Sequence, residues 1–458
     1  MLEAVLDRVS PRGPYPGPRP WPLVGQTLDF ARHGVAGVLE ESWRRYGDFF
    51  RLSAGDRSMF VTIRPEDIET ILIREREKFT KDTVYEQVRL LFGNGLVTSE
   101  GEVWRRQRKI AQPPMVRARV ADLAAPMASA TARMVDDWGG RLTRGQDFDV
   151  YAELLKLTMW IIGDTLFGLD LAGSIDRSAE SFTVALEELS GRGNELVKLP
   201  LWLPTPANRR LRKALTTLDD VVYGIIDSRR RSGDVGDDLL GAFLAARDED
   251  GQPLPTREIR DQVITFFLAG HETTAIALSW TFYLLGQYPT IAAAIEAEVD
   301  EVLGGRTPTA ADVDALDLTR RAFMEALRLY PPAWSGGRDV VAPVEISGFE
   351  VRPPATMMYV PYLTHRHPEF WPDPLRFDPE RFQPAAIKER HRCAYLPFSL
   401  GPRMCIGNHF SLLEGPLILA MICQRFRLRR TPGQRVGRSF QITLRPDPGL
   451  LVRVAEVR

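Results

Sequence analysis

The chain has 458 residues, of which 44% are hydrophobic and 26% charged, and its 59 basic and 60 acidic side chains leave a net charge of −1. This composition is typical of a soluble globular protein, and the balanced charge gives no electrostatic reason to expect a nucleic-acid partner or an anionic surface. At about 100–200 residues per domain the length allows two to four domains, although one large helical enzyme fold can also use a whole chain of this size.

The cysteines and the N-terminal segment indicate the cellular setting. Cys393, Cys405 and Cys423 are odd in number and form no C-x-x-C pair, which argues against a disulfide framework and favours a reducing, cytoplasmic location. Residues 1–22 carry charges and prolines in place of the apolar core of a signal peptide. They also lack the ~20 apolar residues of a membrane span, so we expect an extended, Pro-rich lead-in and no membrane anchor.

Strand patterns follow the lead-in and then give way to helical ones. Segments 48–53 and 58–63 are predicted strands, and 64–77 has helical periodicity. Helical patterns dominate from Trp104 to Tyr330. The predicted fold is therefore mainly helical, with a smaller strand-rich portion.

The clearest helical pattern is the segment 256–287, with Thr256 as a predicted N-cap and Pro289 just beyond its end. Such a helix is about 45 Å long. It is apolar on nearly all sides, as expected of a helix buried through the centre of a large protein. The polar run from His271 to Thr274 in its middle therefore needs partners or a function.

The last part of the chain changes character after Pro331. Short strands and turns come first, a Pro-rich irregular stretch covers 365–397, and a last helix is predicted near 408–424. The stretch PFSLGPRMCIGNHF, 397–410, lies directly before this helix and contains Cys405.

The residues around Cys405 suit a metal-bound cofactor. A thiolate ligand must stay ionised, and the N–H groups of a helix N-terminus favour that state. Gly401 and Gly407 would let the backbone approach a large flat cofactor, Arg403 would neutralise a negative group on it, and Phe398 would cover the sulfur. These residue types fit a haem.

The alternative for a free cysteine is a small buried hydrophobic side chain. We expect this for Cys393 and Cys423, which have no comparable surroundings. At Cys405, by contrast, FSLGPRMCIG matches F-x-x-G-x-R-x-C-x-G without a mismatch. That pattern resembles the haem-binding signature of the cytochrome P-450 family, the haem-thiolate monooxygenases.

Three further segments resemble motifs of this family, in the family's order. AGHETT at 269–274 resembles [AG]-G-x-[DE]-T-[TS], EALR at 325–328 with DPERF at 378–382 resembles the E-x-x-R pair and the segment that meets it, and WRRQR at 104–108 resembles W-x-x-x-R. The resemblance covers nearly the whole chain. It implies a cytochrome P-450 fold with a long central helix and a proximal cysteine loop, as one haem domain over 1–458 with no fused reductase.

The resemblance also implies the cofactor, haem b (iron protoporphyrin IX), with Cys405 as the ligand of its iron. The residues that it places around the haem are Trp104, Arg108, Ala269, Arg338, Phe398, Gly401, Arg403, Cys405 and Gly407. For Trp104 and Arg108 the alternative is a solvated basic face, because Arg105, Arg106 and Lys109 share the segment. Both interpretations can hold, since the outward-facing cations would form a patch on which an acidic electron donor docks.

Glu272 and Thr273 resemble the acid–alcohol pair with which the family delivers protons. A hydroxyl group both donates and accepts, so Thr273 could hold dioxygen together with a water molecule. The alternatives are a hydrogen bond from Thr273 to a carbonyl one turn earlier and an ion pair for Glu272. The small residues Ala269 and Gly270 would leave room for the ligand beside the helix.

Glu325 and Arg328 are one helical turn apart and share a helix face. By resemblance they are buried and joined by Arg381 in a structural network. The role of this network would be cofactor retention and not catalysis.

The substrate is expected to be a hydrophobic small molecule. By resemblance the pocket is lined by Phe266, Ala269, Ala333 and Trp334, with the loop 80–100 and the tip near 446–450. The apolar, Pro-rich segment 198–206 is expected to form part of a mobile lid, with contact to a membrane surface as the alternative.

The predicted function is insertion of one atom of O2 into this substrate, by a monomer that binds no nucleic acid. Electrons would come from a ferredoxin and its reductase, or from a flavodoxin-like donor, because no G-x-G-x-x-G follows a strand. Two alternatives stay open. One is a peroxide-driven haem-thiolate enzyme (peroxygenase or isomerase), although such relatives generally depart from the acid–alcohol pair. The other is a non-enzymatic haem sensor or carrier, which needs no proton-delivery pair.

Overall fold

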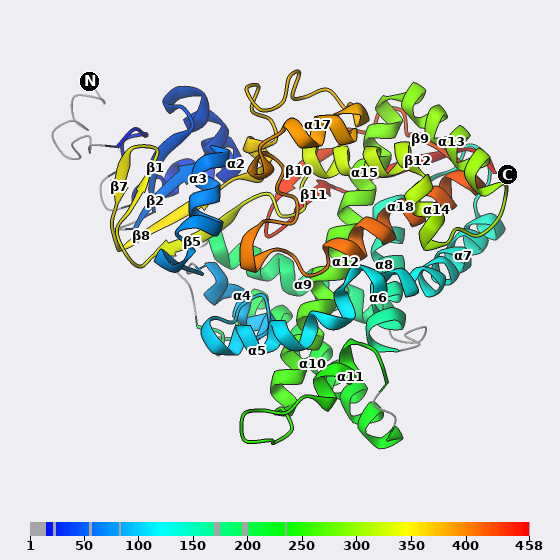
Figure 1. Cartoon of the computed structure of the whole chain (residues 1–458), viewed down its shortest axis with the longest axis horizontal. Helices are drawn as coiled ribbons and strands as arrows, with labels where there is room; N and C mark the ends of the chain where they lie inside the picture. Colours follow the sequence, from blue (N-terminus) through cyan, green and yellow to red (C-terminus); the bar gives the residue numbers. More distant parts are fainter. Residues whose placement is uncertain are drawn as a thin grey trace.

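The computed structural model describes residues 15–21, 24–54, 57–81, 84–168, 175–194, 200–233 and 236–457. Helices fill most of the molecule, and the largest sheet lies at one side of it (Figure 1). The prediction of a mainly helical fold with a smaller strand-rich portion is confirmed. Among the described helices, none combines the length and the apolar composition that crossing a membrane requires.

The largest sheet joins the N-terminal strands to strands from the last third of the chain. Its order is β1-β2-β8-β5-β3, and the pair β2–β8 is parallel while its other pairs are antiparallel. Its strands are β1 (Phe49–Ala54), β2 (Arg57–Thr62), β3 (Phe79–Lys81), β5 (Gly336–Val340) and β8 (Ala355–Tyr359). The two predicted strands therefore form, as β1 and β2.

Three smaller sheets complete the strand-rich portion. They are the three-stranded sheet β4-β12-β9 and the hairpins β10-β11 and β6-β7. The bounds are β4 (Asp147–Asp149), β6 (Val344–Ile346), β7 (Phe349–Val351), β9 (Phe426–Arg430), β10 (Gly437–Phe440), β11 (Leu444–Asp447) and β12 (Leu451–Val457).

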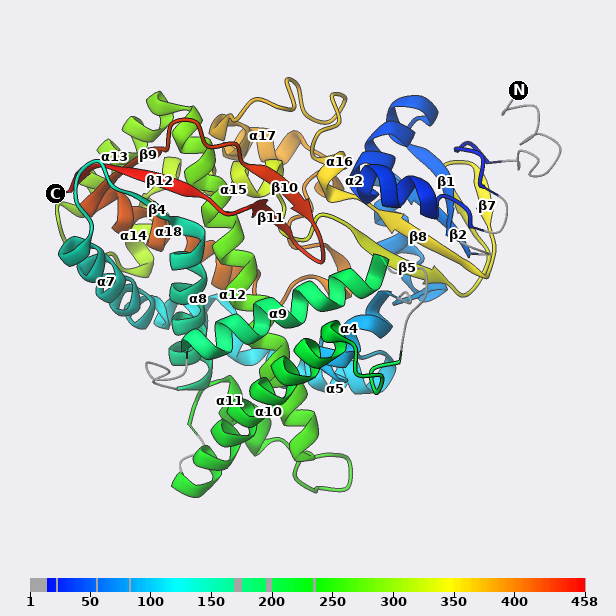
Figure 2. The ribbon, with the colours of Figure 1, turned by 180° about the vertical axis from the view of Figure 1, so that it is seen from behind.

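The helices surround the long α12 (Figures 1 and 2). In chain order they are α2 (Thr27–Tyr46), α3 (Pro65–Glu69), α4 (Val84–Phe92), α5 (Gly101–Ala111), α6 (Arg117–Asp122), α7 (Ala124–Arg141), α8 (Val150–Phe167), α9 (Ile175–Asn194), α10 (Pro206–Ser232), α11 (Leu239–Ala245), α12 (Thr256–Gln287), α13 (Pro289–Leu303), α14 (Ala310–Ala315), α15 (Asp317–Leu329), α16 (Pro361–Thr364), α17 (Pro384–Glu389) and α18 (Asn408–Arg425).

The central helix α12 has the predicted extent, and it is buried on most of its surface. Its N-cap differs from the prediction. Pro255 holds the N-cap position and Thr256 is already helical, without a side-chain cap. The Thr256 hydroxyl instead accepts a hydrogen bond from Arg230 Nη1 at 2.8 Å. The prediction of Thr256 as N-cap is therefore wrong, because a tertiary partner takes the hydroxyl.

Two other predicted segments differ from expectation or are only partly described. The helical pattern 64–77 divides into α3, a wide π-type turn over Thr70–Arg74 and a short 3-10 turn over Arg76–Lys78. Of the predicted lid, residues 198–199 lie outside the described residues. The remainder forms a turn before α10, and there Trp202 is 74% exposed.

The described end of the lead-in is extended, as predicted, and lies against β1. Pro16 accepts a hydrogen bond from the backbone N–H of Arg51 at 2.7 Å. The ring of Tyr15 packs edge-on against Phe60, 4.7 Å between centroids. The lead-in thus covers part of the largest sheet.

Candidate functional site

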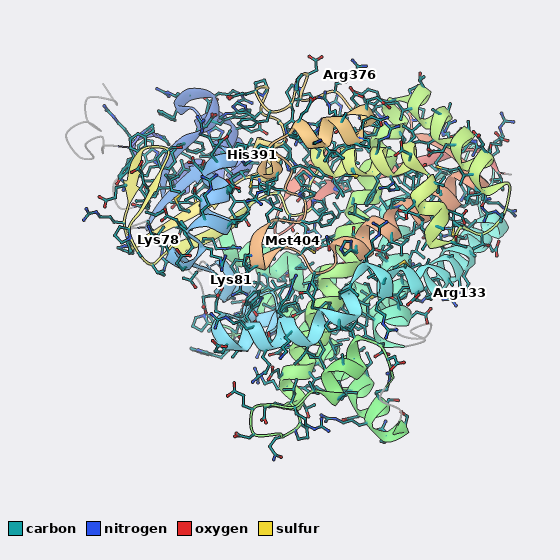
Figure 3. All side chains as sticks on the ribbon, viewed as in Figure 1. Lys78, Lys81, Arg133, Arg376, His391 and Met404 are labelled. Carbon is teal, nitrogen blue, oxygen red and sulfur yellow. The ribbon has the colours of Figure 1, made fainter. Side chains whose placement is uncertain are left out.

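The loop that carries Cys405 lies between a 3-10 turn, Gly401–Arg403, and the first turn of α18. The backbone N–H of Cys405 donates to the Phe398 carbonyl at 2.9 Å, which closes the loop. In Figure 3 the neighbouring Met404 lies near the middle of the view. The Cys405 side chain retains accessible surface, whereas Cys393 and Cys423 are buried, as predicted for them.

The surroundings of Cys405 shift the pKa of its thiol in opposite directions. Dense protein around the thiol raises its pKa by desolvation, although the side chain is accessible on one side. The N–H of Gly407 and the guanidinium of Arg108 lower that pKa. Arg108 is fixed in place, because its Nη1 donates to the Met404 carbonyl at 2.9 Å. A metal would complete the shift toward the thiolate that these two donors begin.

The two glycines of the loop have different surroundings. Gly401 has φ +74°, and a Cβ built there would overlap the carbonyl oxygen of Leu72. Its lack of a side chain is therefore required by the turn Thr70–Arg74 in the protein itself. A Cβ at Gly407 would lie 3.8 Å from Cys405 Sγ and 3.9 Å from Met115 Cε, which are ordinary contacts. Packing within the protein therefore explains why residue 401 is glycine, whereas at residue 407 the explanation is a bound cofactor.

A cluster of cations lies beside the cysteine loop. The Arg403 guanidinium is stacked 3.8 Å from the centroid of the Trp104 ring and pairs with Glu100. Lys81 on β3 stands in register with Arg338 on β5. Burial, followed by repulsion from Arg403 and Arg338, lowers the pKa of Lys81 to about 7, while Glu100 opposes the shift.

These charges test whether a haem fits. The cation cluster, which we define as Lys81, Arg338 and Arg403, has Glu100 as its neighbouring carboxylate. A concentration of positive charge of this kind suits an anionic ligand, and the two propionates of haem b supply such charge. Together with an accessible cysteine at a helix start, the residues present fit the group.

Lys81 and Glu100 lie in the loop 80–100 that was expected to line the pocket, but sequence reasoning did not assign them to the cofactor site. Neither residue lies in a family motif, and Lys81 precedes Arg338 by 257 positions in the sequence. The ammonium group donates to the carbonyl of Val97 and lies 4.6 Å from the Tyr85 ring centroid. Only the sheet register brings Lys81 to the cluster, and no local signal in the sequence could have indicated it.

Ala269 and Thr273 on α12 retain accessible surface, whereas Leu268, His271, Glu272 and Thr274 are buried. They are one turn apart and so share a face of the helix. Gly270 has a packing role in addition to the space for a ligand, which stays a prediction. A Cβ there would overlap the side chain of Ile162 on α8, so this glycine allows two helices to pack closely.

Glu272 and Thr273 point in different directions, because successive helical residues are about 100° apart. The Thr273 hydroxyl donates to the Ala269 carbonyl at 2.7 Å, the one-turn hydrogen bond considered as its alternative. Glu272 is turned toward the β10–β11 hairpin, where Thr443 Oγ1 donates to its Oε1 at 3.2 Å. Among the described side chains no hydrogen bond joins the two residues, and their role as a catalytic pair stays a prediction.

The electrostatics of Glu272 match those of a proton donor and acceptor. Burial raises its pKa to about 7, with Arg445 and Thr443 opposing the shift and Glu187 adding to it. A carboxyl group with this pKa exchanges its proton near neutral pH. The neighbouring His271 does not, because burial lowers its pKa to about 4.

The four predicted pocket residues divide into two pairs. Ala269 and Ala333 retain accessible surface. Trp334 is instead packed against Phe440, 5.3 Å between ring centroids, and its indole N–H donates to the Gln441 carbonyl. Phe266 is likewise buried, beside Phe243. The place of all four residues in a pocket wall stays a prediction.

The structure brings together the predicted network of Glu325, Arg328 and Arg381. Arg328 Nε and Nη2 donate to the two Glu325 oxygens at 2.6 and 2.7 Å, and both side chains are fully buried. Arg381 Nε lies 3.4 Å from Glu325 Oε1. Arg328 Nη1 also donates to the carbonyls of His365 and Pro374. The network thus anchors the irregular stretch before the cysteine loop to α15.

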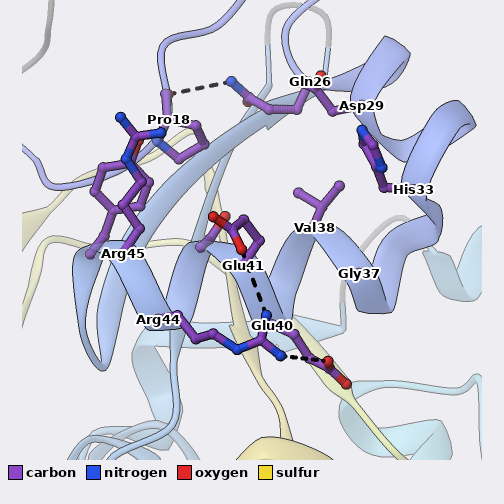
Figure 4. A pocket seen from close by; sticks show the side chains of 12 residues that line it. Pro18, Gln26, Asp29, His33, Gly37, Val38, Glu40, Glu41, Arg44 and Arg45 are labelled. Atoms are coloured by element: carbon purple, nitrogen blue, oxygen red, sulfur yellow. Dashed lines mark hydrogen bonds and ion pairs between the residues drawn. The ribbon is translucent and has the colours of Figure 1, made fainter.

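A surface hollow elsewhere has no part in this site. It lies between the lead-in and α2 and has a volume of about 560 Å³ (Figure 4). Several charged side chains line it, and there Arg44 pairs with Glu40 and Glu41 at 3.2 and 3.6 Å. Neither α12 nor the cysteine loop borders it.

Comparison with known proteins identifies relatives over almost the full length. The family model "Cytochrome P450" matches residues 15–453. Cyclooctatin synthase of Streptomyces melanosporofaciens is 38% identical, over 93% of this chain and 92% of the relative. Cyclooctat-9-en-7-ol 5-monooxygenase of the same organism is 36% identical, over 91% and 92%. Pentalenene oxygenase of Streptomyces avermitilis is 34% identical, over 90% of each chain.

A solved structure agrees with these matches. The crystal structure of the cytochrome P450DA heme domain superposes with a TM-score of 0.87 at 29% sequence identity. The alignment covers 97% of this chain and 98% of the other. The similarity therefore includes the whole helical body together with the strand-rich portion.

Proposed function

Because the chain belongs to the cytochrome P450 family and is a monooxygenase, we propose that its substrate is a hydrophobic small molecule and that separate proteins supply its electrons. The reaction balances as RH + O2 + 2 electrons + 2 protons giving ROH + H2O. The bound haem would supply iron whose thiolate ligand favours cleavage of the O–O bond. The chain would hold the cofactor, exclude water and manage the protons.

The observation that carries the proposal is the surroundings of Cys405. An accessible thiol follows a closed loop, lies at the start of α18 and has Arg108 beside it. The cation cluster includes Arg403, which precedes Cys405 in the same loop, and it would bind the propionates of the same cofactor. Cys405 would bind the iron, Arg108 would stabilise the thiolate, and the cluster with Trp104 would orient the ring.

The names of the relatives narrow the substrate class. Two of them act, by name, on cyclooctat-9-en-7-ol and pentalenene, a cyclic olefinic alcohol and a cyclic olefin. The accessible Ala269 and Ala333 are small and apolar, which suits a rigid hydrocarbon skeleton. We therefore infer a cyclic hydrocarbon, with at most a hydroxyl group, as the substrate of this chain.

Electron supply is proposed from a ferredoxin with its reductase or from a flavodoxin-like protein. Of the predicted docking patch, Arg105 and Lys109 are exposed on α5. Arg106 is instead engaged by Glu258, both of whose oxygens lie 2.9 Å from Nη2. Arg105→Glu and Lys109→Glu should slow the first electron transfer and weaken its salt dependence, whereas Arg231→Glu at the end of α10 should not.

A cytoplasmic location, a monomeric state and the one-domain organisation stay predictions.

The proximal ligand is tested by the absorption spectrum of the reduced protein with carbon monoxide. The parent and Cys423→Ser should show the red-shifted Soret band of a thiolate-bound haem, and Cys405→Ser should lack it. The same band in both cysteine variants would contradict the assignment of Cys405.

The reaction is tested with cyclic olefins under 18O2, NADPH, a ferredoxin and its reductase. One labelled oxygen atom should enter the product. Full turnover with hydrogen peroxide alone would favour the peroxide-driven alternative, and failure to consume NADPH with any partner would favour a sensor or carrier.

A further inference from the structure

Glu272 is held from the side of α12 that faces the β10–β11 hairpin. It is 4% exposed. Thr443 Oγ1 donates to Glu272 Oε1 at 3.2 Å, and Arg445 Nη1 lies 3.9 Å from the same oxygen. The sequence motif that contains Glu272 does not include Thr443 and Arg445, which lie 171 and 173 positions further along the chain.

Arg445 has a second carboxylate partner. Its Nη2 lies 3.4 Å from Oε1 of Glu187 on α9, and it also contacts the amide oxygen of Gln441. The Arg445 side chain is 10% exposed, whereas that of Glu187 is 54% exposed. One nearly buried guanidinium therefore lies between a buried acid on α12 and an acid at the surface.

The remaining titratable group at this junction is Tyr151 on α8. Burial raises its pKa and Glu272 adds to the shift, while Arg445 opposes it. Tyr151 therefore stays neutral near pH 7, and Asp149 acts on it only as a further negative charge. The charges that can change the state of Glu272 are thus those of Arg445 and Glu187.

The helix α9 brings Glu187 to this junction. It lies across the molecule over α12 (Figure 2). Its Phe182 ring contacts His271 and Phe267 of α12, with centroid distances of 5.4 and 6.4 Å. Because Glu187 belongs to α9 and Arg445 to β11, the distance between these two side chains depends on how α9 packs against α12.

We propose that Arg445 is a positioning residue that Glu272 and Glu187 share, so that the charge of the buried acid depends on the position of α9. When α9 is close, the guanidinium is divided between two carboxylates and the Glu272 proton is retained. When α9 withdraws, Arg445 acts on Glu272 alone and favours release of the proton. The inference rests on the proposed function, in which each turnover consumes two protons.

The physical basis is competition for one cation in a site of low dielectric. An opposite charge within about 4–6 Å favours the ionised form of a carboxyl group, and a like charge disfavours it. Burial and Glu187 raise the pKa of Glu272, and Arg445 lowers it, which gives a pKa of about 7. Near neutral pH a small change in the surrounding charge therefore causes the largest change in the protonated fraction of Glu272.

The test follows the carboxylic acid C=O stretch of Glu272 by infrared difference spectroscopy across pH 5–9. The band is assigned by its loss in Glu272→Gln. Arg445→Gln should move the midpoint upward by about one unit or more, and Arg445→Lys should return it toward the parent value. Glu187→Gln should move it downward, because the competing carboxylate is gone.

Glu188→Gln is the matched control for Glu187→Gln. It is the next residue on α9, and its partner is Arg210 on α10, so the midpoint should not move. An unchanged midpoint in Arg445→Gln, or an upward shift in Glu187→Gln, would overturn the proposal. If the buried Arg445 variants do not fold, the surface variant Glu187→Gln against Glu188→Gln still decides the outcome.

A second readout separates this inference from the proposed function. In the haem-loaded protein, Arg445→Gln and Glu187→Gln should change the solvent deuterium isotope effect on NADPH consumption in opposite directions. Infrared shifts as expected in a protein without oxygenase activity would support the junction and contradict the function. Oxygenase activity with an unmoved infrared midpoint would contradict the junction alone.

Discussion

Lys81 and Arg338 lie directly opposite each other on the antiparallel strands β3 and β5. Like charges in this relationship repel and destabilise a sheet, and the pKa of Lys81, lowered to about 7 chiefly by burial, reflects the cost. An arrangement of this kind is unfavourable in the protein alone and becomes favourable with an anionic ligand. We therefore infer that the carboxylates of the cofactor would bind beside these two residues.

Lys81→Met should stabilise the haem-free protein at low pH and weaken haem binding. The folded pKa of Lys81 is below its unfolded value of 10.5. The unfolded state therefore binds more protons between about pH 7 and 10, and the parent gains stability as pH rises through this range. The Tm advantage of Lys81→Met should be largest near pH 6 and decline toward pH 10. A constant Tm difference would contradict this, and the haem-loaded variant should lose haem to apomyoglobin faster than the parent.

Arg328→Met should destabilise the protein strongly. The substitution removes the main partner of Glu325, whose carboxyl group stays in a fully buried site. The expected loss in the free energy of unfolding is roughly 3–5 kcal/mol. Urea unfolding of the haem-free protein measures this difference. Arg352→Met is the control, because Arg352 and Glu350 form an exposed pair for which about 0–1 kcal/mol is expected. A loss below 1 kcal/mol in Arg328→Met would show that the network does not anchor the loop.

Gly401→Ala and Gly407→Ala should separate the needs of the fold from those of the cofactor. At Gly401 the positive φ and the Leu72 carbonyl oppose any side chain, so the variant should lose about 1–2 kcal/mol from the backbone conformation alone. At Gly407 the backbone φ is −87° and a methyl group makes ordinary contacts. Gly407→Ala should keep the unfolding midpoint of the haem-free protein and lower haem affinity. Unchanged haem affinity would remove Gly407 from the cofactor site.

Glu414→Gln should alter the pH dependence of stability. Glu414 on α18 is fully buried. Burial raises its pKa to about 8, with Thr274 opposing the shift. The folded state thus binds more protons between about pH 4.5 and 8, and the parent should lose stability relative to Glu414→Gln as pH rises through this window. Parallel curves of Tm against pH would contradict the assignment.

The extent of α12, the strands β1 and β2, and the network of Glu325, Arg328 and Arg381 were predictable from the sequence. Arg381 was assigned to the network only by the resemblance to the cytochrome P-450 family. The helix, the strands and the pairing of Glu325 with Arg328 depend on local information: hydrophobic periodicity over one segment, or a side-chain spacing within one helical turn. The loop around Cys405 belongs to the same class, because its glycines, arginine and cysteine lie within ten residues. A motif of this length carries its own geometry and chemistry.

Other parts of the site depend on residues that are distant in the sequence. Lys81 joins the cation cluster through strand register, Gly401 meets Leu72 through loop packing, and Trp334 turns into the core to reach Gln441. The sequence pattern alone gives no signal for these contacts, since the partners belong to separate elements whose relative positions only the packed core decides.

Glu272 shows the division most clearly. The sequence by itself determined that an acid stands in the middle of the central helix, beside Thr273, and that it must find a partner or a function there. Only the tertiary structure decided that this acid turns toward Thr443 and Arg445 and shares the latter with Glu187. The physical reason is that helical periodicity specifies the face on which a side chain lies, whereas its charge depends on whichever elements fold against that face.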